Sequence, residues 1–117
     1  MKILQNELNI ETTRGDTLSF GVELQELGQA LDTIYFTCKR NYDDETPLFQ
    51  KSLGNGITLD HNEGNTYYYV VRIAPDDTKN LEVGNYYYDL QIGVNNDVFT
   101  ISKGVLTIEY DITNGVM

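Results

Sequence analysis

The chain has 117 residues, the length of one domain and enough to bury a hydrophobic core. Its 18 acidic and 8 basic residues give a net charge of −10, which disfavours nucleic acids and anionic lipids as partners, because they bind clustered lysine and arginine. The single cysteine, Cys38, excludes an intramolecular disulfide.

No targeting or membrane segment is evident along the chain. Residues 1–6 lack the apolar stretch of a signal peptide, and no run approaches the ~20 apolar residues of a transmembrane helix. No linker or shift in composition divides the sequence. We therefore expect one domain over residues 1–117, with frayed ends near 1–6 and 113–117, made in the cytoplasm and without membrane contact.

The first half of the chain alternates apolar and polar residues with period two, which predicts strands with one buried face. Leu8 and Ile10 give a short first strand, and the turn at 14–16 leads into a second strand over 18–24. The next strand covers 33–39, with Ile34, Phe36 and Cys38 facing inward. A polar loop over 41–47, an extended segment over 48–53, a glycine turn over 54–56, a short strand over 57–59 and a polar turn over 60–65 follow.

The second half continues the alternation. Tyr67, Tyr69, Val71 and Ile73 share one face of a strong strand, and so do Tyr86, Tyr88, Leu90 and Ile92. Residues 95–97 favour a tight hairpin, after which Phe99 and Ile101 should point inward. Gly104 should end that strand, and a last strand should place Leu106, Ile108 and Tyr110 on one face.

One short segment, near residues 75–81, has a helical pattern because a proline starts it and acids follow in its first turn. The chain then runs into Gly84-Asn85-Tyr86-Tyr87-Tyr88, which resembles the corner between strands E and F of immunoglobulin-type domains, where a tyrosine hydroxyl binds the loop backbone. Seven to nine short antiparallel strands with frequent turns predict an immunoglobulin-like β-sandwich.

Candidates for catalysis and metal binding are weak. His61 is the only histidine and lies in the predicted polar turn without a nucleophile motif beside it, and Cys38 should be an inert core thiol. The run starting at Asp60 has oxygen ligands two residues apart, as a calcium loop does, but Val71 stands where an EF-hand needs glutamate. With 18 acids, a chance pair at glycosidase spacing carries no information. We expect no catalytic residue, metal or cofactor.

Three tyrosines predicted to face outward are the candidate partner interface: Tyr35, Tyr68 and Tyr87. Tyrosine is enriched at protein interfaces and its amphipathic ring also suits sugar binding. If their three strands are neighbours, the rings would form an exposed aromatic strip. The alternative is that they pack under a loop or pair across strands and only stabilise the sheet.

Several segments carry a family resemblance. They are Arg14-Gly15-Asp16-Thr17, Tyr35-Phe36-Thr37-Cys38-Lys39, Pro47-Leu48-Phe49-Gln50-Lys51-Ser52-Leu53, Gly84-Asn85-Tyr86-Tyr87-Tyr88-Asp89-Leu90-Gln91-Ile92 and Gly104-Val105-Leu106-Thr107-Ile108. Across most of residues 8–113 the chain resembles small tail or baseplate proteins of bacteriophages and prophages of Gram-positive hosts, in particular the N-terminal domain of baseplate upper proteins. Those proteins continue into a longer region, so this chain is expected to act as a free-standing module.

The resemblance implies a non-enzymatic structural component of a phage tail or baseplate, located in the virion and partnered by other phage structural proteins. A homo-oligomer is also possible in principle, because an exposed sheet edge can pair with a second copy. No site residue carries over, since the likeness lies in strands and turns. The alternative hypothesis is a carbohydrate-binding module that recognises bacterial cell-wall glycan through the same tyrosines.

Overall fold

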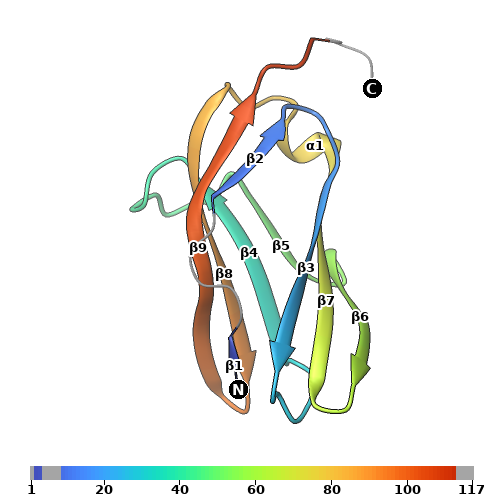
Figure 1. The fold of residues 1–117 in the computed structure, drawn as a ribbon. Coiled ribbons are helices and arrows are strands. Elements are labelled where there is room, and N and C mark those ends of the chain that lie inside the picture. Colours follow the sequence, from blue (N-terminus) through green and yellow to red (C-terminus); the bar gives the residue numbers. More distant parts are fainter. Residues whose placement is uncertain (1, 4–8, 113–117) are drawn as a thin grey trace.

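The computed structural model describes residues 2–3 and 9–112, which form an all-β immunoglobulin-like sandwich (Figure 1). The elements in chain order are β1 (Lys2–Ile3), β2 (Ile10–Thr13), β3 (Leu18–Gln25), β4 (Thr33–Lys39), β5 (Phe49–Leu53), β6 (Gly56–Glu63), β7 (Thr66–Ile73), α1 (Pro75–Thr78), β8 (Gly84–Val94) and β9 (Asp97–Glu109). The described part of the chain has no helix that is long and apolar enough to cross a membrane.

The strands form two layers that are joined along one side. Their order is β1-β3-β7-β6-β5-β4-β8-β9-β2, and β6 meets β5 at only two residue pairs, Ser52 with Gly56 and Leu53 with Ile57. One layer therefore contains β1, β3, β7 and β6, and the other contains β5, β4, β8, β9 and β2 (Figure 1). The first two described strands thus belong to different layers.

The expectation of purely antiparallel strands is wrong at two places. β2 runs parallel to β9, and the short contact between β5 and β6 is also parallel. The first arises because the N-terminal segment pairs with β3 through β1 and then crosses to the other layer at β2. The second arises because the Gly54 turn redirects the chain out of one layer and into the next.

The core lies between the layers and matches the predicted inward faces. Ile34, Phe36 and Cys38 are all completely buried. The ring of Phe36 packs against those of Phe20, Phe49 and Tyr88, with centroids 5.7, 6.2 and 5.1 Å away. Aromatic and aliphatic burial of this kind is the main contribution to the stability of so small a domain.

The predicted tyrosine corner is present. Tyr86 is buried at the start of β8, and its hydroxyl donates a 2.6 Å hydrogen bond to the backbone carbonyl of Glu82, four residues upstream. The predicted helical turn is α1, where the Asp77 carboxylate accepts a 2.7 Å hydrogen bond from the backbone N–H of Ala74. These two contacts fix the connection between β7 and β8.

Two predicted breaks do not occur. β9 continues through Gly104, because this residue and both its neighbours pair with β8; a bulge at Ile101 shifts the register without ending the strand. β6 continues to Glu63, so His61 lies on a strand and the turn is reduced to Gly64 and Asn65. Longer paired strands satisfy more backbone hydrogen bonds than the predicted loops would.

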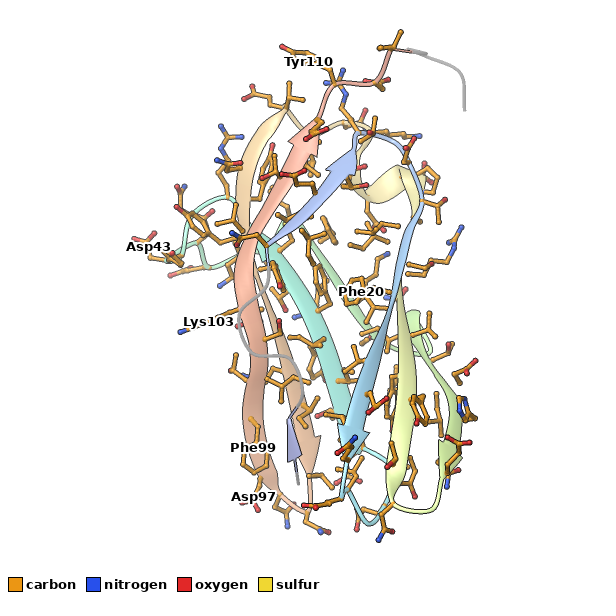
Figure 2. The ribbon with its side chains drawn as sticks, viewed as in Figure 1. Phe20, Asp43, Asp97, Phe99, Lys103 and Tyr110 are labelled. Atoms are coloured by element: carbon orange, nitrogen blue, oxygen red, sulfur yellow. The ribbon has the colours of Figure 1, made fainter. Side chains whose placement is uncertain are left out.

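The ends of the predicted strands also need correction. Phe99 was expected inside but is 39% exposed, because it lies near the open end of β9, beside the hairpin (Figure 2). Tyr110 lies beyond β9 and is 74% exposed. Of the expected frayed ends, Lys2 and Ile3 instead pair with β3, while the rest of 1–6, Leu8 and residues 113–117 lie outside the described residues.

Candidate functional site

A groove runs across the outer face of the layer that contains β5, β4, β8 and β9. We call it the outer groove; its hollow has a volume of about 900 Å³. It exists because alternation turns every second side chain of these strands away from the core. The strand residues at its centre are Gln50, Thr37, Asp89 and Lys103, and those at its ends include Tyr35, Gln91, Lys39 and Tyr87.

The centre of the outer groove is one row of four polar side chains, each from a different strand. Thr37 of β4 lies opposite Gln50 of β5 and Asp89 of β8, and Asp89 lies opposite Lys103 of β9. The Gln50 side-chain amide donates a 2.9 Å hydrogen bond to the Thr37 hydroxyl. The row therefore presents hydroxyl, amide, carboxylate and ammonium groups within one straight line across the sheet.

Tyrosines lie on both sides of that row. Tyr87 pairs with Lys39 on one side, and Tyr35 pairs with Gln91 on the other. Tyr42 of the loop between β4 and β5 stacks on Tyr87, with ring centroids 4.0 Å apart, while remaining 79% exposed itself. The same loop carries Asp43 and projects away from the sheet (Figure 2). An exposed ring on a projecting loop gives the groove a raised aromatic wall.

The surroundings of the charged side chains in the outer groove determine their pKa and whether they form ion pairs. Burial raises the pKa of the Asp89 carboxyl above its ordinary value, and the positive charge of Lys39 partly offsets this rise. Neither Lys39 nor Lys103 forms an ion pair with any residue in the described ranges 2–3 and 9–112. The groove thus offers one partly buried acceptor and two ammonium groups to a ligand.

The structure separates the three predicted interface tyrosines. Tyr35 and Tyr87 both line the outer groove, as expected for neighbouring strands β4 and β8. Tyr68 lies on the outer face of the other layer, between Glu23 of β3 and His61 of β6. The condition for a continuous strip of three tyrosines, that their strands be neighbours, is therefore not met, because β7 does not neighbour β4 or β8.

Tyr68 belongs to a different surface, with its own contacts. Its ring stacks on His61 at a centroid distance of 4.3 Å, and the His61 Nδ1 lies 2.6 Å from a carboxylate oxygen of Asp60. The pKa of Tyr68 is raised. The largest cause is loss of solvent around its hydroxyl, and smaller causes are a hydrogen bond to Glu63 and the negative charges of Glu23 and Glu63. His61 is therefore engaged by an acid and a ring on an exposed strand.

Cys38 is a core residue, as predicted. It is completely buried, and burial raises the pKa of its thiol to about 12, so the reactive thiolate is not formed near neutral pH. Among the residues that the structure describes, no group of three or more histidine, cysteine, aspartate or glutamate side chains is placed to hold a metal ion.

No protein-family model matches the sequence, and no curated protein sequence matches it. In fold, the chain is similar to part of a solved glycoside hydrolase of family 123 from Clostridium perfringens, studied for glycolipid glycan hydrolysis, with a TM-score of 0.56 and 11% identity. The likeness covers 91% of this chain but only 23% of the hydrolase. At this identity it shows a shared β-sandwich fold alone.

Proposed function

We propose that the protein is a non-enzymatic component of a phage or prophage tail or baseplate, and that it works by binding through the outer groove. The observation that carries the binding role is the groove itself, in which tyrosines from two strands and a loop surround a row of polar groups. Concave surfaces with a few convergent polar groups are the usual binding sites of proteins.

The role in a phage particle is supported by the resemblance of the strand and turn segments to the N-terminal domain of baseplate upper proteins. Two residues that were considered for catalysis lie outside the groove: the Cys38 thiol is buried with a pKa of about 12, and His61 contacts Asp60 and Tyr68 on the opposite layer. These placements support a role that does not use cysteine or histidine catalysis.

The free edge of β6 is a poorer docking surface than the outer groove. Residues 58–63 pair with β7 on one side and with no described strand on the other. However, a bulge interrupts the edge between Leu59 and His61, and Asp60 and Glu63 place negative charge along it. Bulges and charges are the features by which proteins block pairing at exposed edges.

The test is light scattering after size-exclusion chromatography, with the protein alone and mixed with the products of the adjacent genes. We expect the mixture to elute as a defined complex of higher mass, and the Tyr87→Ala variant shows whether the outer groove takes part in forming it. Tyr68→Ala is the matched control, because it removes an outer-face tyrosine from the other layer. A folded protein that joins no neighbouring gene product would contradict the virion role, and a complex that Tyr87→Ala weakens more than Tyr68→Ala does would make a protein partner the occupant of the groove.

The same experiment measures the oligomeric state of the protein alone. A dimer that persists in Tyr87→Ala would place self-association outside the outer groove, whereas a dimer lost in that variant would make a second copy the occupant of the groove. Circular dichroism of each variant establishes that the fold is retained.

A further inference from the structure

We propose that the occupant of the outer groove is an uncharged oligosaccharide chain and not the surface of another protein. This inference rests on the proposed binding role of the groove and specifies its ligand. Three features carry it: the polar character of the groove's centre, the mixture of hydrogen-bonding groups there, and the tyrosines on either side.

The centre of the outer groove has the wrong composition for a protein interface. Protein interfaces are depleted of charged residues at their centre, with lysine, glutamate and aspartate reduced, and carry their polar groups at the rim. Here Asp89 and Lys103 lie opposite each other in the middle row, and tyrosines lie to the sides. An apolar anchor from a partner protein would have to desolvate these groups without pairing them, which costs free energy.

A sugar hydroxyl is both a donor and an acceptor, and the middle row can satisfy both roles. The Asp89 carboxylate only accepts hydrogen bonds, and the ammonium groups of Lys39 and Lys103 only donate them. Gln50 donates to Thr37 through its side-chain nitrogen, so its carbonyl oxygen still accepts. A polyhydroxylated ligand could therefore replace the water on each of these groups with a direct hydrogen bond.

The tyrosines supply apolar surface for the ring faces of the sugar. Tyr87 lies on β8 itself, and Tyr35 of β4 lies opposite Gln91, four positions further along β8. At about 3.3 Å per residue, their rows are roughly 13 Å apart along the strand. Tyr42, stacked on Tyr87 but largely exposed, extends that end of the groove. The length suits a chain of several sugar rings better than a single one.

The electrostatics favour an uncharged chain. Within the groove, the positive charges of Lys39 and Lys103 are balanced by the negative charges of Asp89 and Glu45. The whole chain carries −10, so its field repels acidic polymers that approach it. A charged ligand would be attracted by some of these groups and repelled by the others. A ligand with no net charge avoids this conflict, and the negative field of the whole chain does not repel it.

The test is calorimetric titration of the full chain with three neutral hexasaccharides, hexa-N-acetylchitohexaose, cellohexaose and mannohexaose, with hyaluronate as the anionic comparison. We expect binding of at least one neutral chain and weaker or absent binding of hyaluronate. Tyr87→Ala and Asp89→Asn should each weaken the binding about tenfold or more, as the loss of an aromatic or charged contact of a binding site commonly does. Tyr68→Ala should leave the affinity unchanged.

Tyr42→Ala keeps the test valid if Tyr87→Ala disturbs the fold, because the Tyr42 side chain is 79% exposed and its loss should not affect folding. It should also weaken saccharide binding. The proposal is overturned if no neutral chain binds at millimolar concentration, if binding survives both tyrosine changes, or if hyaluronate is preferred. If the unchanged protein binds no saccharide and Tyr87→Ala loses co-assembly, this inference alone is overturned. If the groove variants change neither co-assembly nor saccharide binding, the proposed function is overturned as well.

Discussion

Tyr86 and Tyr87 are neighbours in sequence but serve opposite faces of β8. The Tyr86 ring is buried, its hydroxyl binds the Glu82 carbonyl, and the Arg40 guanidinium lies 5.3 Å from the ring centroid. Tyr87 lies in the outer groove against Tyr42. Replacing either hydroxyl therefore tests a different property of the molecule.

We expect Tyr86→Phe to lower the free energy of unfolding by about 1 kcal/mol or somewhat more, because it keeps the buried ring and removes only the hydroxyl, which donates to the Glu82 carbonyl and accepts a 3.2 Å hydrogen bond from the Arg40 guanidinium. Tyr87→Phe, in which no such bond is lost, should leave the stability almost unchanged. Urea denaturation of both variants measures the difference. Equal stability of the two variants would show that the corner hydrogen bond contributes nothing.

Asp89 couples the outer groove to pH. Burial raises its pKa in the folded protein, so the folded state holds this proton more tightly than the unfolded chain does. Its contribution to stability therefore decreases as the pH rises through the folded-state pKa, and the charged carboxylate is unfavourable near neutral pH. The groove retains it at a cost, as binding sites commonly do.

Asp89→Asn should accordingly be more stable than the unchanged protein near pH 7, and its advantage should shrink as the pH falls toward the ordinary carboxyl pKa of 3.8. Urea midpoints measured across this range give the trend. Asp43→Asn, in an exposed loop, is the control and should show no such trend. An advantage that grows on acidification would contradict the assigned cause.

At the residue scale, the sequence predicted side-chain direction well and neighbours poorly. Alternation placed Ile34, Phe36 and Cys38 in the core and Tyr35 and Tyr87 outside. It could not select Tyr42, because a loop residue follows no period and its position depends on the fold of the loop over Tyr87. Asp89 was visibly outward, but nothing in the sequence indicated its burial or its place between two lysines.

Among the elements, β5 carries a lysine on its inner side, which the alternation of its sequence alone does not explain. Lys51 lies opposite Phe36, on the inner side of the strand, and its ammonium lies 2.7 Å from the Asp77 carboxylate of α1. The two side chains are only 12% and 14% exposed. Asp77 also accepts the hydrogen bond from Ala74 N–H, so one carboxylate holds both the helical turn and the strand.

Asp77→Asn should therefore lower the free energy of unfolding by about 2 to 3 kcal/mol, because it leaves a poorly solvated ammonium without its counter-charge. The adjacent Asp76 is the matched control: its pair with Lys79 is exposed, so Asp76→Asn should change stability little. Thermal unfolding of both variants is the measurement. Similar melting temperatures would mean that water replaces the Lys51 contact.

The elements themselves were largely predictable, and their ends were not. The turn at Asn95 and Asn96 is the predicted hairpin, because both residues adopt positive φ, 53° and 67°, as asparagine tolerates. The predicted break at Gly104 was wrong because a glycine within a strand pattern has two readings. It can mark the end of the strand, or it can mark a position near a bulge in a strand that continues. Only the pairing with β8 decides between the two.

At the scale of the whole molecule, acidity is the dominant property. A net charge of −10 is confined to a body whose principal extents are 45 × 29 × 21 Å. Like charges this close repel one another, and dissolved salt screens the repulsion within about 10 Å at moderate ionic strength. The unfolded chain spreads the same charges farther apart, so it suffers less from them.

Raising the salt concentration should therefore increase the melting temperature. NaCl and KCl should act alike at equal ionic strength, since screening does not depend on the identity of the cation. Differential scanning calorimetry at low and moderate salt measures the effect. A melting temperature that falls steadily with salt would show that attractive ion pairs, such as that between Arg14 and Asp111, outweigh the repulsion.

The sandwich was predictable from the number and spacing of the strands, but the neighbours within each layer were not. Tyr68 illustrates the difference: its strand resembles β8 in sequence, with three consecutive tyrosines in each, yet the topology places it on the other layer. Which strands pair depends on long-range packing, and no local pattern in a single sequence contains that information.

Cys38 gives the molecule a chemical reporter of its own opening. It is the only cysteine in the chain, its side chain has no exposed surface, and its thiol resists ionisation. An alkylating reagent in native buffer can reach it only when β4 separates from the core. The rate of modification therefore counts such openings directly, without denaturant or an introduced label, and it does so for every variant that leaves β4 intact.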